Sequence, residues 1–141
     1  MPSLRVGLVG HGAMGRNHAR VLSELEGVDF VGVVDRDAKN TRAAVYDELD
    51  ALLDRGIDYC IVAVPTFRHE EVGLRLVQAG VHALIEKPLA QDSASALRLA
   101  QAFEEAGLIG AVGHIERFNP ALQQARGRMA NGDLGEILQI T

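Results

Sequence analysis

Residues 6–15 read V-G-L-V-G-H-G-A-M-G, a strand-like apolar run that leads directly into the pattern Gly10-x-Gly12-x-x-Gly15. Each glycine has a physical use beside a dinucleotide. Gly10 permits a tight turn, Gly12 lets a pyrophosphate approach the backbone, and Gly15 lets the next helix pack closely on its strand. Asp35 follows the next apolar run, where its carboxylate would accept hydrogen bonds from the ribose hydroxyls. This pattern predicts a dinucleotide-binding turn, and the alternative is a plain strand–turn–helix.

The composition is that of an ordinary globular protein, with 141 residues, 48% hydrophobic content and a net charge of −5. The acidic balance and the lack of basic clusters argue against a nucleic-acid partner. No apolar stretch is long enough to span a bilayer, so we expect no membrane partner and a cytoplasmic location. The single cysteine, Cys60, lies in a strand-like run, and we expect it to be a buried small side chain.

Continuous apolar runs alternate with segments of helical period, which is typical of a parallel sheet covered on both faces. We therefore expect an α/β fold with a doubly wound parallel sheet of the Rossmann type. One connection is short, because only ten residues separate Asp35 from Tyr46. We expect a loop or single turn there, ending in a stub of strand at 43–46. The main strands are expected at 4–9, 30–34, 59–64, 81–85 and 109–112.

Helix boundaries are also marked in the sequence. Asp92 or Ser93 is a suitable N-cap for the helix that follows, and glycines at 27, 80 and 107 are suitable stops. Near the end, Asn119-Pro120 predicts another helix start, and residues 134–141 alternate like a strand. We expect residues 1–118 to form the dinucleotide-binding domain and residues 119–141 to open a second, truncated α+β domain.

Unusual residues follow three of the predicted strands: Pro65-Thr66, Glu86-Lys87-Pro88 and His114. Ligands of open α/β sheets bind outside the carboxyl ends of the strands, so these positions are candidates for chemistry. Lys87 is one of only two lysines in the sequence. If it is partly buried there, it could exchange a proton with a substrate hydroxyl. The alternative, which the sequence supports equally, is a surface lysine in a turn with no part in catalysis.

Three motifs together resemble the glucose-fructose oxidoreductase / inositol dehydrogenase (Gfo/Idh/MocA) family. They are the glycine loop 10–15, Ala63-Val64-Pro65-Thr66 with His69, and Glu86-Lys87-Pro88-Leu89. The resemblance extends from residue 4 to about residue 120. It implies an NAD-dependent oxidoreductase, with NADP as the alternative cofactor, that transfers hydride between nicotinamide and the hydroxyl or ketone of a sugar or nucleotide sugar.

The resemblance also implies a site. Lys87 becomes the catalytic and substrate-binding candidate, and the Lys87–Pro88 peptide bond is expected to be cis. Arg117 becomes a substrate-binding candidate within a hinge similar to that of UDP-N-acetylglucosamine-type dehydrogenases; its alternative is an ion-paired or capping arginine. In the family a second domain supplies an Asp and a His. The implied cofactor-binding residues are Gly10, His11, Gly12, Ala13, Met14, Gly15, Asp35, Arg36, Pro65, Thr66, His69 and Glu86.

Other chemistries have weaker support. The five histidines and one cysteine show no metal-ligand spacing, so no metal site is expected, and His18 is expected to be structural. A non-catalytic NAD-binding sensor or assembly module remains the main alternative function. An S-adenosylmethionine methyltransferase is a weaker alternative, because its glycine-rich loop also precedes a strand ending in an acid. We expect a homo-oligomer and a 141-residue chain that is inactive alone.

Overall fold

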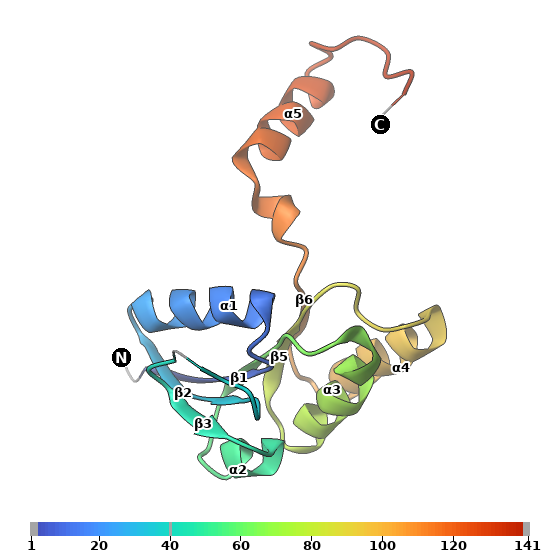
Figure 1. Cartoon of the computed structure of the whole chain (residues 1–141). Helices are drawn as coiled ribbons and strands as arrows, with labels where there is room; N and C mark the ends of the chain where they lie inside the picture. The colour runs from blue at the N-terminus through green and yellow to red at the C-terminus, as the bar shows by residue number, and fades with distance from the viewer. Residues whose placement is uncertain (1–2, 40, 140–141) are drawn as a thin grey trace.

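The computed structural model describes residues 3–39 and 41–139, and its centre is a six-stranded sheet (Figure 1). All five neighbouring strand pairs are parallel, and the strand order is β3-β2-β1-β4-β5-β6. The chain moves outward from β1 to β3 and then returns to the other side of β1 with β4. The predicted doubly wound α/β sheet is therefore confirmed. The strands are β1 (Leu4–Val9), β2 (Val28–Val34), β3 (Ala44–Tyr46), β4 (Tyr59–Val62), β5 (His82–Ile85) and β6 (Gly110–Val112).

The helices cover the sheet on both faces. Helix α1 lies on one face, and α2, α3 and α4 lie on the other (Figure 1). This division follows from right-handed crossovers, because the direction of strand addition reverses at β1. The helices are α1 (Ala13–Glu24), α2 (Leu49–Leu53), α3 (His69–Gln78), α4 (Ser93–Glu105) and α5 (Pro120–Ala130), with short 3₁₀ turns η1 (Thr66–Arg68) and η2 (Ile115–Phe118).

Alternate side chains of the strands β1, β2, β4 and β5 enter two separate apolar layers. On the α1 side, Leu8 and Ile61 pack with Leu22 of the helix. On the other side, Val62 and Ile85 pack with the apolar faces of α2, α3 and α4. Because both faces are buried, the strands need apolar residues at consecutive positions, which explains the continuous runs in the sequence. Cys60 is fully buried in β4 as expected, and desolvation raises the pKa of its thiol.

The predicted helix boundaries are confirmed where the sequence marked them. The carboxylate of Asp92 accepts a hydrogen bond from the backbone N–H of Ser95 and caps α4. Asn119 caps α5 in the same way through Ala121. The predicted glycine stops have positive φ, with +77° at Gly27 and similar values at 80 and 107.

Two connections bear on the expectations. The segment after Asp35 forms a turn and a loop in its described residues and returns as the three-residue strand β3, as predicted. The strand expected at 134–141 is wrong for residues 134–139, which form a turn and irregular chain; residues 140–141 lie outside the described part. A strand needs a hydrogen-bonded neighbour, and every strand pairing in the described part belongs to the single sheet formed by β1–β6. The strand expected at 59–64 also ends earlier, at Val62.

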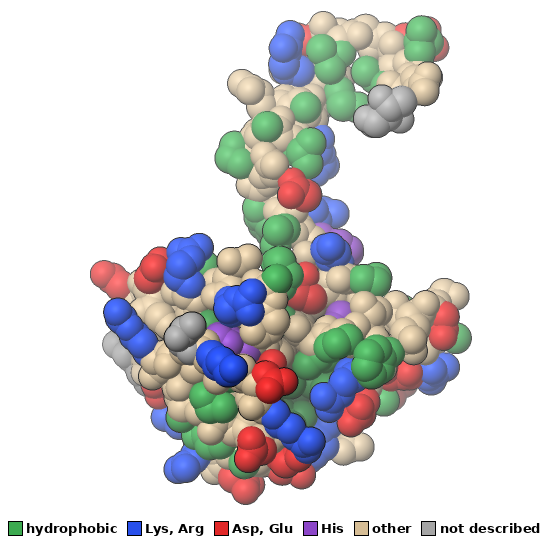
Figure 2. Space-filling view, viewed as in Figure 1, with side chains coloured by type: hydrophobic (Ala, Val, Ile, Leu, Met, Phe, Trp, Pro, Cys, Tyr) green, Lys and Arg blue, Asp and Glu red, His purple; other side chains and the backbone are tan. Residues whose placement is uncertain are grey.

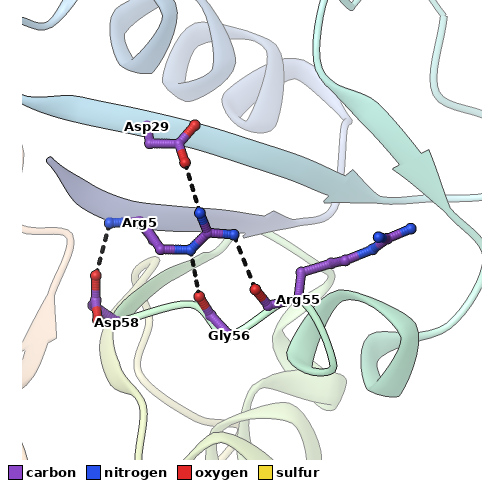
Figure 3. A network of polar contacts seen from close by, with 5 residues as sticks. All are labelled: Arg5, Asp29, Arg55, Gly56 and Asp58. Carbon is purple, nitrogen blue, oxygen red and sulfur yellow. Dashed lines mark hydrogen bonds and ion pairs between the residues drawn. The ribbon is translucent and has the colours of Figure 1, made fainter.

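Arg5 fastens the amino-terminal edge of the sheet (Figure 3). Its guanidinium donates to the backbone oxygens of Gly56, at 2.7 Å, and Arg55, at 2.9 Å, and pairs with Asp29 at 3.0 Å. Its backbone N–H donates to the carboxylate of Asp58. The side chain thus joins β1, β2 and the turn after α2 at the end of the sheet opposite the ligand-binding edge.

The last part of the chain forms an arm that projects from the sheet (Figure 1). We use "arm" for residues 114–139, and each of these is exposed or half-buried. Hydrophobic side chains lie along it, as Figure 2 shows, and Phe118 is 77% exposed. Within residues 3–39 and 41–139, every helix is too short or too polar to cross a membrane.

Candidate functional site

A pocket of about 1130 Å³ opens at the carboxyl ends of β1, β2 and β4. It lies at the point where the chain changes direction in the sheet, which is the usual ligand-binding position in such folds. The glycine loop forms one wall, the residues after β2 and β3 form a second, and residues 63–65 with one face of α3 form a third. Seven of the residues predicted to bind cofactor line it: Gly10, Gly12, Ala13, Met14, Asp35, Arg36 and Pro65.

The three glycines meet different constraints in the structure. Gly10 has φ of +94°, and a Cβ there would lie 2.5 Å from the carbonyl oxygen of Ala63. A Cβ on Gly15 would collide with the carbonyl oxygen of Gly10. A Cβ on Gly12 would meet no protein atom within 4 Å, and Gly12 provides no side-chain cap to α1. Gly10 and Gly15 therefore shape the loop, while Gly12 leaves the helix N-terminus open to a ligand.

Asp35 connects the second strand to the glycine loop. One carboxylate oxygen accepts from the backbone N–H of His11 at 2.6 Å, and the other accepts from Asp37 at 2.9 Å. These bonds fix the carboxylate at the pocket wall. Each carboxylate oxygen retains a further lone-pair direction, which is what two ribose hydroxyls require.

The wall beside Asp35 carries an ion pair. The guanidinium of Arg36 donates to Glu48 at 2.7 Å, and this hydrogen bond raises the pKa of Arg36 above its ordinary value. Glu48 is the N-cap position of α2, and residues 47–50 all line the pocket. The connection before β3 is short, and the start of α2 supplies part of the pocket wall beside it. Sequence reasoning missed this contribution. Its one sequence signal is that Asp47 and Glu48 directly follow a strand.

The turn Glu86-Lys87-Pro88 follows β5. Lys87 is exposed, and its peptide bond to Pro88 is cis, as expected. The turn lies outside the lining of the 1130 Å³ pocket, as does Thr66, which begins η1. Since β5 is the parallel neighbour of β4, the turn emerges at the same edge of the sheet as Pro65.

Glu86 is buried, with only 5% of its surface exposed. Its Oε1 lies 2.8 Å from Nε2 of His18 on α1, and its Oε2 accepts from the backbone N–H of Lys87 at 3.2 Å. A Cβ on Gly113 would lie 3.1 Å from the carboxylate, so the chain after β6 closes the third side. Sequence reasoning missed this contact, because nothing in the local pattern relates His18 to a residue 68 positions later.

His69 lies behind the pocket and is 1% exposed. Its Nδ1 lies 2.9 Å from the carbonyl oxygen of Pro88, and its Nε2 lies 2.9 Å from that of Val64. Both partners only accept hydrogen bonds, so the ring donates to both at once only when both nitrogens carry a proton. The resemblance implied that His69 contacts cofactor. In the structure its ring lies between the loops that follow β4 and β5.

Two further candidates lie away from the pocket lining. The side chain of His11 is buried, and this residue reaches the site through its backbone bond to Asp35. Arg117 lies exposed on η2 in the arm. Within residues 3–39 and 41–139, no group of three His, Cys, Asp or Glu side chains is arranged to hold a metal ion.

Comparison with known protein families identifies this fold. The family model described as an oxidoreductase family with an NAD-binding Rossmann fold (GFO_IDH_MocA) matches residues 4–114. The chain belongs to this family. The match confirms the resemblance and the expected NAD-binding oxidoreductase domain, and it excludes the methyltransferase alternative.

Several curated members of the family are similar in sequence. A 4-carboxy-2-hydroxymuconate-6-semialdehyde dehydrogenase from Sphingobium sp. is 34% identical, over 93% of this chain and 44% of the relative. An inositol 2-dehydrogenase from Corynebacterium glutamicum is also 34% identical, over 98% and 44%. A UDP-N-acetylglucosamine 3-dehydrogenase from Acidithiobacillus ferrooxidans is 35% identical, over 89% and 42%. The chain therefore spans less than half the length of these relatives.

Solved structures of the family agree with the fold. The myo-inositol 2-dehydrogenase of Lactobacillus plantarum superposes with a TM-score of 0.87 at 25% identity, over 96% of this chain and 43% of that one. GenD2 from gentamicin A biosynthesis, solved in complex with NAD, superposes with a TM-score of 0.75 at 36% identity. The match covers 80% of this chain and 35% of GenD2.

Proposed function

We propose that this chain is the cofactor-binding part of an NAD(H)-dependent dehydrogenase that acts on a hydroxyl or ketone of a sugar, cyclitol or nucleotide sugar. The observation that carries the proposal is the shared edge of the sheet. The glycine loop and Asp35 line a pocket at this edge, and Lys87 follows a strand that ends at the same edge. A dinucleotide held in the pocket would extend from the β2 side toward the β5 side.

Lys87 is proposed as the catalytic residue. Bound NAD supplies the hydride acceptor or donor at its nicotinamide ring. An ammonium or amine at Lys87 would hold the substrate hydroxyl by a hydrogen bond and exchange its proton as the carbon is oxidised or reduced. Pro65, Thr66 and Glu86 are proposed to border the nicotinamide, and Arg117 to contact the substrate.

The substrate class rests on the relatives' names. Inositol and UDP-N-acetylglucosamine dehydrogenases act on hydroxyls of rings that carry several oxygens. A lysine and an arginine that donate hydrogen bonds suit such rings. We propose that residues 1–118 form the cofactor domain, that residues 119–141 open the substrate domain, and that the protein is a cytoplasmic homo-oligomer.

NAD(H) is proposed in preference to NADP(H). The carboxylate of Asp35 would repel a 2′-phosphate, and the nearby Arg36 is already paired with Glu48. The pocket wall formed by residues 47–50 adds further negative charge.

A titration of the purified chain with NADH tests cofactor binding. The sequence has no tryptophan, so the fluorescence of NADH itself is the signal. Wild type should bind NADH more tightly than NADPH, and Asp35→Ala should weaken NADH binding. Asp54→Ala, which removes an exposed carboxylate at the end of α2, is the matched control and should bind as wild type does. Equal NADPH affinity, or unchanged binding by Asp35→Ala, would contradict the proposal.

The position of Lys87 has its own test. Reductive ¹³C-methylation labels the two lysines, Lys39 and Lys87, and the terminal amine. Addition of NAD⁺ should move the Lys87 signal in an NMR spectrum. Lys39→Arg assigns the signals. A Lys87 signal that stays still while NAD⁺ saturates the chain would remove Lys87 from the nicotinamide site.

A further inference from the structure

We infer that His18 and His69 are positioning residues that hold the Glu86-Lys87-Pro88 turn from its two sides. The inference rests on the proposed role of Lys87 and assigns to it two histidines whose side chains lie outside the lining of the 1130 Å³ pocket. His18 holds the residue before Lys87, and His69 holds the residue after it.

The first contact is a partly buried hydrogen bond between a helix and the residue after a strand. The side chains of His18 and Glu86 are 17% and 7% exposed, and their Nε2 and Oε1 atoms are 2.8 Å apart. A carboxylate only accepts, so Nε2 of His18 donates the hydrogen bond. The same carboxylate accepts from the backbone N–H of Lys87. His18 therefore orients a group that bonds directly to the Lys87 backbone.

The second contact anchors the other end of the turn. The ring of His69, at the start of α3, bridges the carbonyl oxygens of Pro88 and Val64. Val64 belongs to the loop after β4 that lines the NAD pocket. Through His69, the turn that carries Lys87 is thus tied to the wall of the cofactor pocket.

The contacts made by His18 and His69 hold the residues on either side of Lys87, and the Lys87 side chain between them is exposed. Glu86 is buried beneath it, Gly113 closes on the Glu86 carboxylate, and Lys87 itself is exposed. A backbone fixed on both sides limits the volume that the lysine amine explores. That restriction lowers the entropic cost of bringing the amine to a reacting hydroxyl. The contacts assign His18, which lies in the second turn of α1, to the site.

The ¹³C-methyl signal of Lys87 measures this restraint in the chain as it exists. His18→Leu should displace or broaden the Lys87 signal, because it removes the hydrogen bond to Glu86. His18→Gln should restore a signal close to that of wild type, since a glutamine amide donates at about the same reach. Asn17→Leu, an exposed neighbour on α1, is the matched control and should leave the signal unchanged. The signal of Lys39 should stay constant in every variant.

Folding is checked in the same samples by NADH titration and thermal unfolding. A folded His18→Leu with an unchanged Lys87 signal would overturn the inference, as would a failure of His18→Gln to restore it. If His18→Leu does not fold, Glu86→Gln and His69→Gln take its place. Both should displace the Lys87 signal, and wild-type signals in both would overturn the inference. If the wild-type chain does not bind NADH, that result contradicts the proposed function instead.

Discussion

At the scale of single residues, Gly10 and Gly12 have different roles in the glycine loop. Gly10 is needed for the shape of the loop, and Gly12 is proposed to leave room for the cofactor. Gly10→Ala should destabilise the fold by about 1–3 kcal/mol, because alanine at φ +94° is strained and its Cβ meets the Ala63 carbonyl. Gly12→Ala should unfold like wild type, since its Cβ meets open space, yet it should bind NADH more weakly. Urea unfolding and NADH titration of both variants check this. Equal stability of the two would contradict the assignment.

Cofactor choice also depends on a single side chain. Glu48→Gln should raise NADPH affinity relative to NADH, because it releases Arg36 from its ion pair and removes a negative charge from the pocket wall. Parallel titrations with the two cofactors measure the ratio. The pair is exposed, so we expect a change of a few-fold at most. Glu24→Gln, which removes a carboxylate paired with Arg20 on α1, should leave the ratio unchanged.

Sequence reasoning reached the residues whose role depends on the local backbone. The glycine loop, Asp35 and the cap at Asp92 are recognisable because spacing and residue type alone define their chemistry. It expected His18 to be structural but did not identify Glu86 as its partner, and it did not identify the carbonyl partners of His69. Their partners are distant in the sequence or are backbone carbonyls, and neither leaves a pattern.

At the scale of elements, the Arg5 network joins two strands to the turn after α2 (Figure 3). Arg5→Met should lower the free energy of unfolding by about 1–2 kcal/mol, because backbone carbonyls lose a charged donor that is partly screened by solvent. NADH affinity should stay unchanged, since the network lies at the opposite edge from the pocket. Arg20→Met removes only an exposed helix pair and should have little effect. Chemical denaturation with both variants measures the difference.

A second network joins α3 and α4 and should make stability depend on pH. The hydrogen bond from Arg98 lowers the pKa of Glu70 below 4.5, and the backbone N–H of Ser95 lowers that of Asp92 below 3.8. Groups with a lowered pKa in the folded state stabilise it above their ordinary pKa. That stabilisation is lost as pH falls through the folded-state values. The thermal unfolding midpoint should therefore decrease as the pH is lowered below about 4.5. Arg98→Met should reduce this drop, and an identical pH profile would contradict it.

Elements with apolar runs, strong periodicity or end signals were predictable, and the shortest helices were not. The five main strands and α1, α4 and α5 have apolar runs, stripes or caps. Helix α2 has five residues, too few to show a helical period, and η1 and η2 are shorter still. The strand expected at the end failed because alternation alone does not supply a pairing partner.

At the scale of the whole molecule, we expect the arm to be separable from the proposed cofactor domain. Among the residues that the structure describes, none after Gly113 is buried, and the arm projects away from the sheet (Figure 1). A chain ending at residue 118 should keep the unfolding midpoint and the NADH affinity of the longer one. Calorimetry and NADH titration measure the two quantities. A large loss of either would show that the arm belongs to the first domain.

An amide-resolved NMR titration with NAD⁺ tests whether the cofactor binds at the glycine loop. The structure offers a second, apolar groove of about 400 Å³ between α4 and β6, which serves as an internal comparison. We expect the largest shifts at residues 10–15, Asp35 and Val64, with residues 110–112 unaffected. Saturable binding with its largest shifts in the α4–β6 groove, or no binding at all, would contradict it.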